Sequence, residues 1–155
     1  MRLGYFKTKF IFTDGFPTSN NLAKIFPINL SKPNDELNSD FPLILSTGRL
    51  LEHWHTGTMT RRAVILNELE PDPMIFMNKV DINFYNLDLN KSVIIETRRG
   101  KISIKIRHDN DLLPGMIFLP FCFKEAAANI LTNSDLDPIG KIPELKFSAA
   151  RVYQN

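Results

Sequence analysis

The amino-acid sequence predicts a domain that is mainly β, with short helices between the strands, folded as a small closed barrel. Two observations support this fold class. After residue 40, six or seven short apolar runs follow one another, separated by segments rich in glycine, proline, asparagine and aspartate, which is typical of strands joined by turns. The run at 102–106 alternates isoleucine with Ser103 and Lys105, the pattern of a half-buried strand. Closure into a barrel leaves no unpaired edge among strands this short.

Residues 1–40 differ from the rest of the chain. The run 7–12 fits a short strand, and Asn20-Asn21 fits the turn of a hairpin that leads into 22–26. The stretch 31–40 is polar and contains Pro33, which is typical of a linker. The alternative is an unstructured arm, because polar termini are often poorly ordered. We interpret residues 1–40 as the tail of a preceding domain plus a linker, and residues 41–155 as the main domain.

The elements after residue 40 follow from apolar periodicity and turn residues. The predicted strands are 41–46, 74–77, 92–97, 102–106, 116–121 and 144–153. The predicted helices are 60–69, with apolar residues at 63, 65, 66 and 69, then 80–87, and the alanine-rich 124–131; turns are expected at 113–115 and 135–138. Asp81 is expected to cap the second helix. Gly100 is expected to supply a positive φ in a hairpin whose solvated tip carries Arg98 and Arg99.

Composition narrows the possible functions. The 155 residues are 43% hydrophobic and 23% charged, which is ordinary for one globular domain with a core. A net charge of +2 does not indicate a nucleic-acid partner. The single cysteine, Cys122, excludes an intrachain disulfide and a cluster held by four thiolates, and its position between two phenylalanines predicts a core residue. Because the sequence has no apolar run of membrane-spanning length and no signal-peptide pattern, we expect a cytoplasmic protein without a membrane span.

The stretch 47–62 is the most unusual part of the sequence. It holds four threonines, two glycines, two histidines, three arginines and one tryptophan. Such a set of donors suits an anionic ligand, because glycine lets the backbone approach closely and arginine binds phosphate through two parallel hydrogen bonds. The alternative is a polar loop that only closes one end of the barrel, although polar clusters of this density usually serve a ligand.

A zinc site is a second alternative for the same stretch. His53 and His55 could be two ligands, but a zinc site needs three or four. Only His108 and Cys122 remain as candidates, and neither has the spacing of a metal site. We therefore expect no metal site.

The order of residues in this stretch resembles the signature of the molybdopterin-dinucleotide-binding domain, which ends the large subunits of bis-molybdopterin oxidoreductases. The resemblance is carried by Thr47-Gly48-Arg49, by Glu52-His53-Trp54-His55-Thr56-Gly57 and by Met59-Thr60-Arg61-Arg62. The resemblance is to this domain in formate dehydrogenase catalytic subunits and in periplasmic nitrate reductases. The similarity runs from about Pro42 to Val152 and implies a double-psi β-barrel. A weaker similarity at 16–25 is to the hairpin that ends the preceding domain in formate dehydrogenases.

The resemblance also implies which residues bind the cofactor, molybdopterin guanine dinucleotide. In the signature these are Thr47, Gly48, Arg49, Leu50, Leu51, Glu52, His53, Trp54, His55 and Thr56. Asn129 and Lys146 fall on two further cofactor-contacting positions, and Phe121 falls near the substrate funnel of some relatives. Without the resemblance, Asn129 would be interpreted as a helix residue facing water and Lys146 as an outward residue of an alternating strand.

The implied function is to bind and orient one dinucleotide as the C-terminal domain or fragment of a molybdenum- or tungsten-dependent oxidoreductase. The most similar enzyme is formate dehydrogenase, which oxidises formate to carbon dioxide and removes two electrons. The metal's protein ligand, the electron-transfer cluster and the substrate base have no counterpart in this sequence, so the isolated chain is expected to be inactive and to work with the remaining catalytic domains or subunit. The alternatives are a nitrate reductase-type domain and a non-enzymatic barrel that binds nucleotides or assists assembly, because a fold does not settle function.

Overall fold

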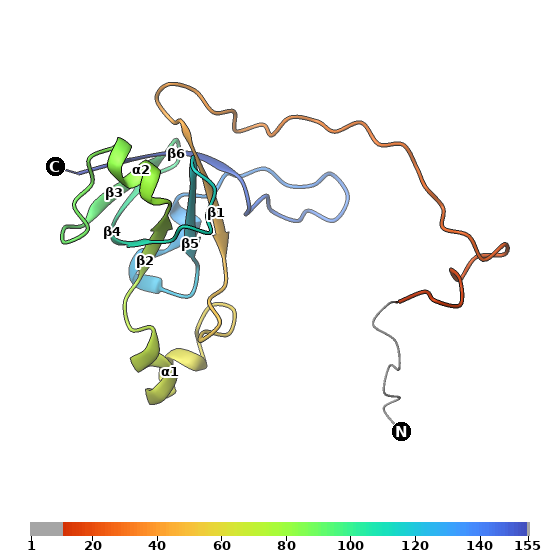
Figure 1. Ribbon diagram of the computed structural model, residues 1–155, viewed down its shortest axis with the longest axis horizontal. Coiled ribbons are helices and arrows are strands. Elements are labelled where there is room, and N and C mark those ends of the chain that lie inside the picture. The colour runs from red at the N-terminus through yellow and green to blue at the C-terminus, as the bar shows by residue number, and fades with distance from the viewer. Residues whose placement is uncertain (1–10, 155) are drawn as a thin grey trace. The chain divides into compact units, whose positions relative to one another are not determined.

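Six strands close into one barrel in the second of the two units that the chain forms. The computed structural model describes residues 11–154, and the chain divides into Met1–Ser31 and Lys32–Asn155. Figure 1 shows the strands: β1 (Leu43–Gly48), β2 (Met74–Met77), β3 (Val93–Thr97), β4 (Lys101–His108), β5 (Met116–Pro120) and β6 (Ser148–Tyr153). Their order around the barrel is β1-β5-β2-β4-β3-β6. The predicted fold class, a mainly β closed barrel of the double-psi type with short helices, is confirmed.

The barrel mixes two parallel strand pairs with four antiparallel ones. β1 runs parallel to β5, with Leu45 opposite Ile117, and β2 runs parallel to β4, with Ile75 opposite Ile106. The other four pairs, β1–β6, β2–β5, β3–β4 and β3–β6, are antiparallel. Each strand therefore has two neighbours, and the barrel presents no unpaired strand edge to solvent.

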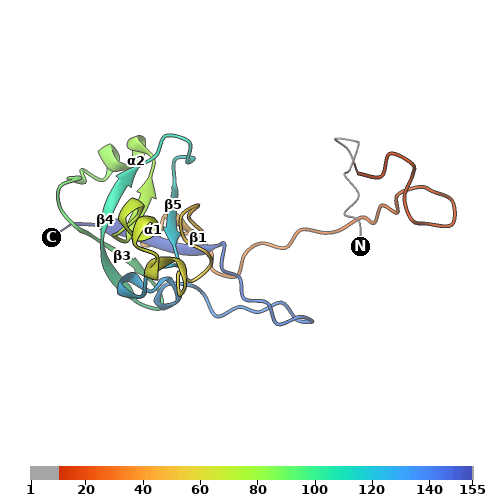
Figure 2. The ribbon, with the colours of Figure 1, turned by 90° about the horizontal axis from the view of Figure 1, so that it is seen from below.

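The core lies inside the barrel and is built from alternate residues of each strand. On β1, for example, Leu43 and Leu45 are buried while Ile44 between them is only partly covered. The strand residues buried in this way are Leu43, Leu45, Ile75, Met77, Val93, Ile95, Ile104, Ile106, Ile117, Leu119, Ala150 and Val152. Branched aliphatic side chains at every second position match the two-residue period of a strand. Figure 2 shows the strands curving around this interior.

The first unit has no strand among the residues that the structure describes there, 11–31. The amide of Phe16 donates to the carbonyl of Asn21 (3.1 Å), and Asn21 has a φ of +57°. A turn thus exists where the sequence predicted a hairpin, but the flanking strands do not form, and that prediction is wrong. A single two-stranded hairpin is marginal without a third strand or a packed face. The strand predicted at 7–12 lies mostly outside the described residues.

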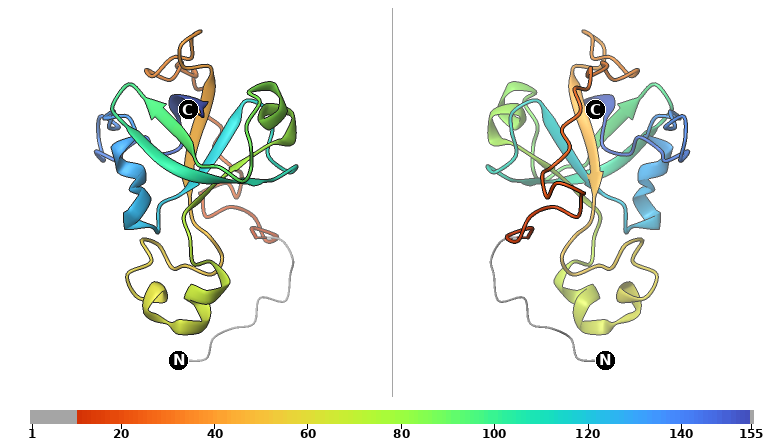
Figure 3. Two further views of the ribbon diagram at one scale, coloured as in Figure 1. Left: turned by 90° about the vertical axis from the view of Figure 1, so that its left-hand side faces the viewer. Right: turned by 90° about the vertical axis from the view of Figure 1, so that its right-hand side faces the viewer.

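The helices are shorter than predicted. The segment 60–69 gives a 3-10 turn, η1 (Thr60–Arg62), and α1 (Val64–Leu69); neither contains a buried residue, so the apolar residues predicted to share one helix face are not buried by residues 11–154. The alanine-rich segment forms two 3-10 turns, η2 (Lys124–Ala126) and η3 (Ala128–Ile130), because Ala127 between them is extended (ψ 105°). Figure 3 shows this segment on one side of the barrel and α2 (Lys79–Phe84) on the other. No helix in residues 11–154 has the length and apolarity needed to cross a membrane.

Two local predictions are corrected by the structure. Asn78, not Asp81, caps α2: its side chain accepts from the Val80 amide (2.8 Å), while Asp81 accepts from the Gly115 amide (2.7 Å) and holds the turn before β5. Gly100 does not have a positive φ; among the described glycines that conformation is adopted by Gly15, Gly57 and Gly115. Gly100 is instead needed for close packing, because a Cβ there would lie 2.7 Å from Ile130 Cγ2.

The tip between β3 and β4 is only partly solvated: Arg98 is exposed and Arg99 is half-buried, and both are bound to another part of the chain. Arg98 and Arg99 both bond the carboxylate of Asp35, at 2.5 and 2.7 Å, and Asp35 also accepts from the Ala149 amide at 2.8 Å. Asp35 is only 6% exposed. The polar stretch 31–40, predicted as a linker, is therefore fastened to the barrel at Asp35.

The last strand begins four residues later than predicted, at Ser148. The residues just before it form scattered hydrogen bonds, including one to Thr47 at the end of β1, instead of a continuous ladder with a neighbouring strand. Asn133 Nδ2 donates to Glu144 Oε2 and to the Phe147 carbonyl, and the Leu145 carbonyl accepts from Thr47. Because their polar groups are used in this way, residues 144–147 do not join the barrel's ladder.

Candidate functional site

The signature stretch leaves the barrel at the end where two parallel strands finish together. Gly48 on β1 is opposite Pro120 on β5, and the Phe121 amide donates to the Gly48 carbonyl (3.1 Å). Carboxyl ends of neighbouring parallel strands lie at the same edge, and ligands often bind where such strand ends meet. Residues 49–62 and 121–131 therefore leave the barrel at the same end.

Thr47 ties this end of β1 to the segment before β6. Its amide and its hydroxyl both donate to the Leu145 carbonyl, at 3.3 and 2.7 Å, and its own carbonyl accepts from Lys146 Nζ. These contacts place the predicted cofactor residues Thr47 and Lys146 beside each other, 99 residues apart in the chain.

Gly48 leaves room for an aromatic ring. A Cβ on this residue would lie 2.3 Å from Phe118 Cε2 and 2.6 Å from Phe118 Cζ, closer than any real contact. Phe118 in turn packs edge to face with Phe76, with ring centres 5.8 Å apart. Glycine here is therefore explained by packing, whatever ligand its backbone approaches.

His53 holds the signature loop together from inside. Its Nε2 lies 2.8 Å from the Glu70 carbonyl and its Nδ1 3.3 Å from Thr60 Oγ1, and the side chain is 1% exposed. Its ring also meets Phe123 edge to face. The Thr60 hydroxyl accepts from the Trp54 amide as well. Because both ring nitrogens have partners within the protein, the His53 side chain is not open to a ligand in this structure.

A cleft of about 450 Å³ lies between the signature loop and the segment after β5. Its lining is Thr47, His55, Thr56, Thr58, Phe121, Phe123, Lys124, Ala127, Ala128, Asn129 and Leu145. His55 has a φ of +51°, a conformation that costs a side-chain-bearing residue energy, and its ring meets Phe121 at 5.3 Å between centres. Imidazole, hydroxyl, amide and ammonium groups thus face one space whose walls are partly aromatic.

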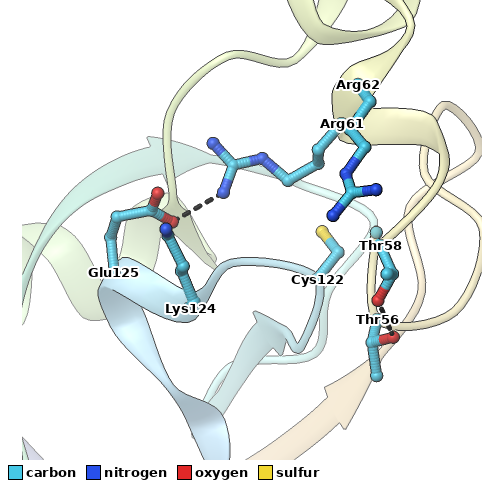
Figure 4. A pocket seen from close by; sticks show the side chains of 8 residues that line it. Thr56, Thr58, Arg61, Arg62, Cys122, Lys124 and Glu125 are labelled. Atoms are coloured by element: carbon cyan, nitrogen blue, oxygen red, sulfur yellow. Dashed lines mark hydrogen bonds and ion pairs between the residues drawn. The ribbon is translucent and has the colours of Figure 1, made fainter.

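A second pocket, of about 400 Å³, borders the cleft and shares Thr56, Thr58 and Lys124 with it. Its remaining lining residues are Gly57, Arg61, Arg62, Cys122 and Glu125. Figure 4 shows Arg61 reaching Glu125, at 2.6 Å, and Arg62 extending toward Cys122 and Thr58. We call it the arginine pocket.

Neighbouring charge and burial determine the protonation state of two side chains in the arginine pocket, Glu125 and Cys122. The pKa of Glu125 is lowered by its own backbone N–H and by the Arg61 guanidinium, so Glu125 is a carboxylate at neutral pH. Burial raises the pKa of the Cys122 thiol to about 11. Cys122 is therefore a protonated thiol at neutral pH, in agreement with the core residue predicted from its two phenylalanine neighbours.

The predicted site residues other than Gly48 and His53, which are both buried, divide into three groups. Thr47, His55, Thr56, Phe121 and Asn129 line the cleft, and Lys146 contacts Thr47 beside it. Other signature side chains face solvent: Leu51 is 97% exposed, Trp54 is 69% exposed, and Arg49 is exposed without a hydrogen bond or ion pair among the described residues. Leu50 and Glu52 are partly covered.

Among the polar residues that line the cleft, two, Thr58 and Lys124, were absent from the prediction. Thr58 lies within the signature stretch and Lys124 directly follows Phe123, so their neighbours in sequence were the available signal. As for metals, the described residues contain no group of three histidine, cysteine or acidic side chains that could hold one.

The family relationship follows from comparison with known sequences. Residues 43–149 match the family model described as "Molydopterin dinucleotide binding domain". The chain belongs to this family. The match covers all of β1 to β5, both pockets and the start of β6, so the cleft described above lies within the family domain.

Curated relatives of this molybdopterin dinucleotide-binding domain are large enzyme subunits. The chain is 41% identical over 145 residues to the F420-dependent formate dehydrogenase subunit alpha of Methanocaldococcus jannaschii, covering 94% of this chain and 22% of the relative. It is 37% identical over 135 residues to the F420-dependent formate dehydrogenase 1 subunit alpha of Methanococcus maripaludis, covering 87% and 20%. A periplasmic nitrate reductase of Campylobacter fetus is 35% identical, covering 85% and 14%. The chain thus spans about a fifth of the length of the formate dehydrogenase subunits it matches.

A solved structure shares the fold. Acetylene hydratase from Pelobacter acetylenicus superposes with a TM-score of 0.65 at 22% sequence identity, covering 74% of this chain and 18% of that one. At this identity the likeness concerns the barrel alone.

Proposed function

We propose that this domain binds molybdopterin guanine dinucleotide in the cleft, as part of a molybdenum- or tungsten-dependent oxidoreductase of the formate dehydrogenase type. One observation carries the proposal. The cleft joins Thr47, His55 and Thr56 of the signature to Asn129, which is more than seventy residues further along the chain. If the signature stretch only closed one end of the barrel, its packing would not require these polar groups to surround a space of about 450 Å³.

The chemistry of the lining fits a dinucleotide. The Asn129 side-chain amide can donate and accept at once, which matches the edge of a guanine or a pterin ring, and Phe121 and Phe123 offer aromatic surface for such rings. His55, Thr56 and Lys124 offer donors to phosphate oxygens. Arg49, exposed at the start of the loop, forms no hydrogen bond or ion pair within residues 11–154, and its guanidinium suits a phosphate or carboxylate brought by a ligand.

The cofactor supplies the redox chemistry when bound, and this chain's residues hold and orient it. The relatives' subunits are about five times longer than the matched region, which supports the proposal that other domains or a partner subunit complete the enzyme. Three formate dehydrogenase alpha subunits match with 34–41% identity and a nitrate reductase with 35%. Formate oxidation is the favoured reaction, because two of the three formate dehydrogenase subunits, at 41% and 37%, are more similar to this chain than the nitrate reductase is. On this proposal the isolated chain is inactive and cytoplasmic.

Cofactor retention after co-expression tests this proposal. The chain is produced together with a formate dehydrogenase alpha subunit that lacks the corresponding domain, and bound pterin and released guanine nucleotide are quantified in the purified complex. Arg49→Ala is expected to reduce retention by about tenfold, because a charge-assisted hydrogen bond contributes roughly 1.5–3 kcal/mol. Arg49→Lys is expected to recover only part of it, because an ammonium cannot make two parallel bonds to one phosphate.

The matched control is Lys79→Ala. Lys79 is an exposed cation on α2, which follows β2 at the far end of the barrel from the signature. Equal retention in Arg49→Ala and Lys79→Ala would contradict a binding role for Arg49. A complex that contains the wild-type chain but no dinucleotide would favour the alternative, a non-enzymatic barrel.

A further inference from the structure

The segment 135–144 forms an ordered loop that precedes β6 and projects from the barrel. Figures 1 and 2 show it in blue, extending away from the strands. Its two arms are joined by an isolated bridge between Leu136 and Pro143, and the Glu144 amide donates to the Asp135 carbonyl at 3.1 Å. We call this segment the Asp137 loop.

The Asp137 carboxylate holds the tip of this loop in one conformation. Its Oδ1 accepts from the amides of Ile139 (3.0 Å) and Gly140 (2.7 Å), and its Oδ2 accepts from the Ile142 amide (2.7 Å). The Asp137 backbone adds two more bonds, from its amide to the Ile142 carbonyl (3.0 Å) and from the Lys141 amide to its carbonyl (3.2 Å). An aspartate that binds the amides after it is a common device for fixing a turn. The tip is therefore ordered without a partner.

The ordered tip carries aliphatic side chains in solvent. Leu136 is 54% exposed, Ile139 92% and Ile142 69%, and Pro138 and Pro143 are exposed as well. Apolar side chains that lie next to one another on an exposed surface are typical of an interaction site. Since the loop is already fixed, little further entropy is lost when a partner covers these side chains.

Charge and position indicate which partner fits the loop. Lys141 is the only charged residue in 138–143 and forms no ion pair within residues 11–154, whereas the Asp137 carboxylate is used by the loop's own amides. The surface is thus apolar with one free positive charge. Just after the loop, Leu145 lines the cleft and Lys146 bonds the end of β1. A partner that covers the cleft therefore also meets the base of the loop.

We propose that the Asp137 loop anchors the remaining catalytic portion of the oxidoreductase, which receives Ile139 and Ile142 in an apolar groove with an acidic rim facing Lys141. This role rests on the proposed function, which requires such a portion because the chain spans about a fifth of the formate dehydrogenase subunits it matches. A stable interface buries roughly 1,200–2,000 Å², more than one loop supplies, so the loop acts together with the surface around the cleft. A few anchor residues commonly carry most of the binding energy of an interface.

The test measures complex formation by the full 155-residue chain. The partner is the Methanocaldococcus jannaschii formate dehydrogenase alpha subunit without its matched region, and the dissociation constant and the dinucleotide content of the complex are both determined. Ile139→Ser and Ile142→Ser are each expected to weaken binding by about tenfold, the effect of one buried aliphatic side chain. Both side chains are exposed in the free chain, so urea unfolding of these variants should match that of the wild type. Lys141→Glu is expected to slow association, because it places like charges opposite each other.

The matched controls lie on α2, away from the loop. Val80 is 61% exposed, so Val80→Ser removes a comparable aliphatic side chain, and Lys79→Glu reverses a comparable exposed charge. Both are expected to bind like the wild type. Asp137→Asn tests the ordering itself, because it keeps the isoleucines but replaces the oxygen that accepts from Ile142 with a donor. It is expected to speed hydrogen exchange of the Ile142 amide and to weaken binding.

The outcomes separate the anchor role from the proposed function. A complex that depends on Ile139 but contains no dinucleotide would support the anchor and count against the proposed function. A dinucleotide-containing complex that Ile139→Ser and Ile142→Ser affect no more than Val80→Ser would overturn the anchor and leave the proposed function intact.

Two further results would overturn the anchor role. The first is self-association of the isolated chain that Ile139→Ser abolishes, because the loop would then bind a second copy of this chain. The second is the absence of any complex with the wild-type chain, in which case GDP binding by the isolated chain would still support the proposed function.

Discussion

Lys146 donates a hydrogen bond from its Nζ to the carbonyl oxygen of Thr47, joining the segment before β6 to the end of β1 beside the cleft. An ammonium has three donors, so this contact leaves Lys146 able to bind a ligand as well. Lys146→Met keeps the side-chain length and removes the donors. We expect a loss of about 1 kcal/mol in the free energy of unfolding, measured in urea, together with weaker dinucleotide retention. Lys79→Met is the control, and equal behaviour of the two variants would show that the contact is unimportant.

Asp35 is expected to be the main anchor of the stretch 31–40. It accepts from Arg98, Arg99 and the Ala149 amide, so Asp35→Ala leaves two partly buried guanidinium groups without their carboxylate. We expect a loss of about 3 kcal/mol in the free energy of unfolding. This is the lower end of the cost of breaking a buried ion pair, because both arginines are partly exposed to solvent. Asp40→Ala, an exposed position in the same stretch, is the control. A loss no larger than that of Asp40→Ala would contradict the anchor.

The contribution of Asp35 is expected to depend on pH. Burial alone would raise its pKa, but hydrogen bonds from Arg99, the Ala149 amide and Arg98 outweigh burial and hold the pKa below the ordinary value of 3.8. In the unfolded chain the pKa of Asp35 keeps its ordinary value of 3.8. The stabilisation by ionised Asp35 is therefore complete at pH values above this pKa, and it is lost as the pH falls through the lower pKa of the folded state. The difference in free energy of unfolding between wild type and Asp35→Asn should therefore be constant near neutral pH and shrink below about pH 4. A difference that grew on acidification would contradict this assignment.

The two histidines of the signature are expected to behave differently. His53 is 1% exposed and bonded at both nitrogens, so His53→Ala should cost roughly 1–3 kcal/mol of stability by leaving the Glu70 carbonyl and Thr60 hydroxyl without this partner. His55 is exposed in the cleft, so His55→Ala should weaken dinucleotide retention with little change in stability. Thermal unfolding and retention measured on both variants check this. The reverse pattern would mean that the cleft is not the binding site.

Gly48 is expected to tolerate no side chain. The added Cβ of Gly48→Ala would overlap the ring of Phe118, at 2.3 Å, and overpacking typically costs about 1–3 kcal/mol. The substitution Phe118→Leu removes this ring. Adding Gly48→Ala to Phe118→Leu should therefore lower the free energy of unfolding by less than Gly48→Ala does in the wild-type protein. If the two substitutions are simply additive, the ring is not the cause.

The barrel was predictable because its strands are long enough to show alternation and are separated by turn residues. The strands at 74–77, 92–97, 102–106 and 116–121 were each placed to within about two residues. The local details were not predictable, because each depends on a partner far away in the chain. Gly100 packs against Ile130, and Asp81 bonds Gly115 instead of capping its own helix.

The site was predicted in part, for the same reason. The signature and its resemblance indicated Thr47, His55 and Asn129, which the structure brings to one cleft. Sequence order could not tell that His53 points inward while His55, two residues later, faces the cleft, because the loop between them is irregular. The pairing of Arg99 with Asp35 was equally hidden, since 64 residues separate them.

The pairing of β1 has a consequence for how the protein is made. Both neighbours of β1, which are β5 and β6, lie more than sixty residues further along the chain. During synthesis, residues 43–48 leave the ribosome well before either partner exists, with Leu43 and Leu45 still uncovered. Contacts of such long sequence separation slow folding, because the loop between the partners must be ordered first. The nascent chain is therefore expected to depend on chaperones until residues 148–153 emerge and the barrel can close.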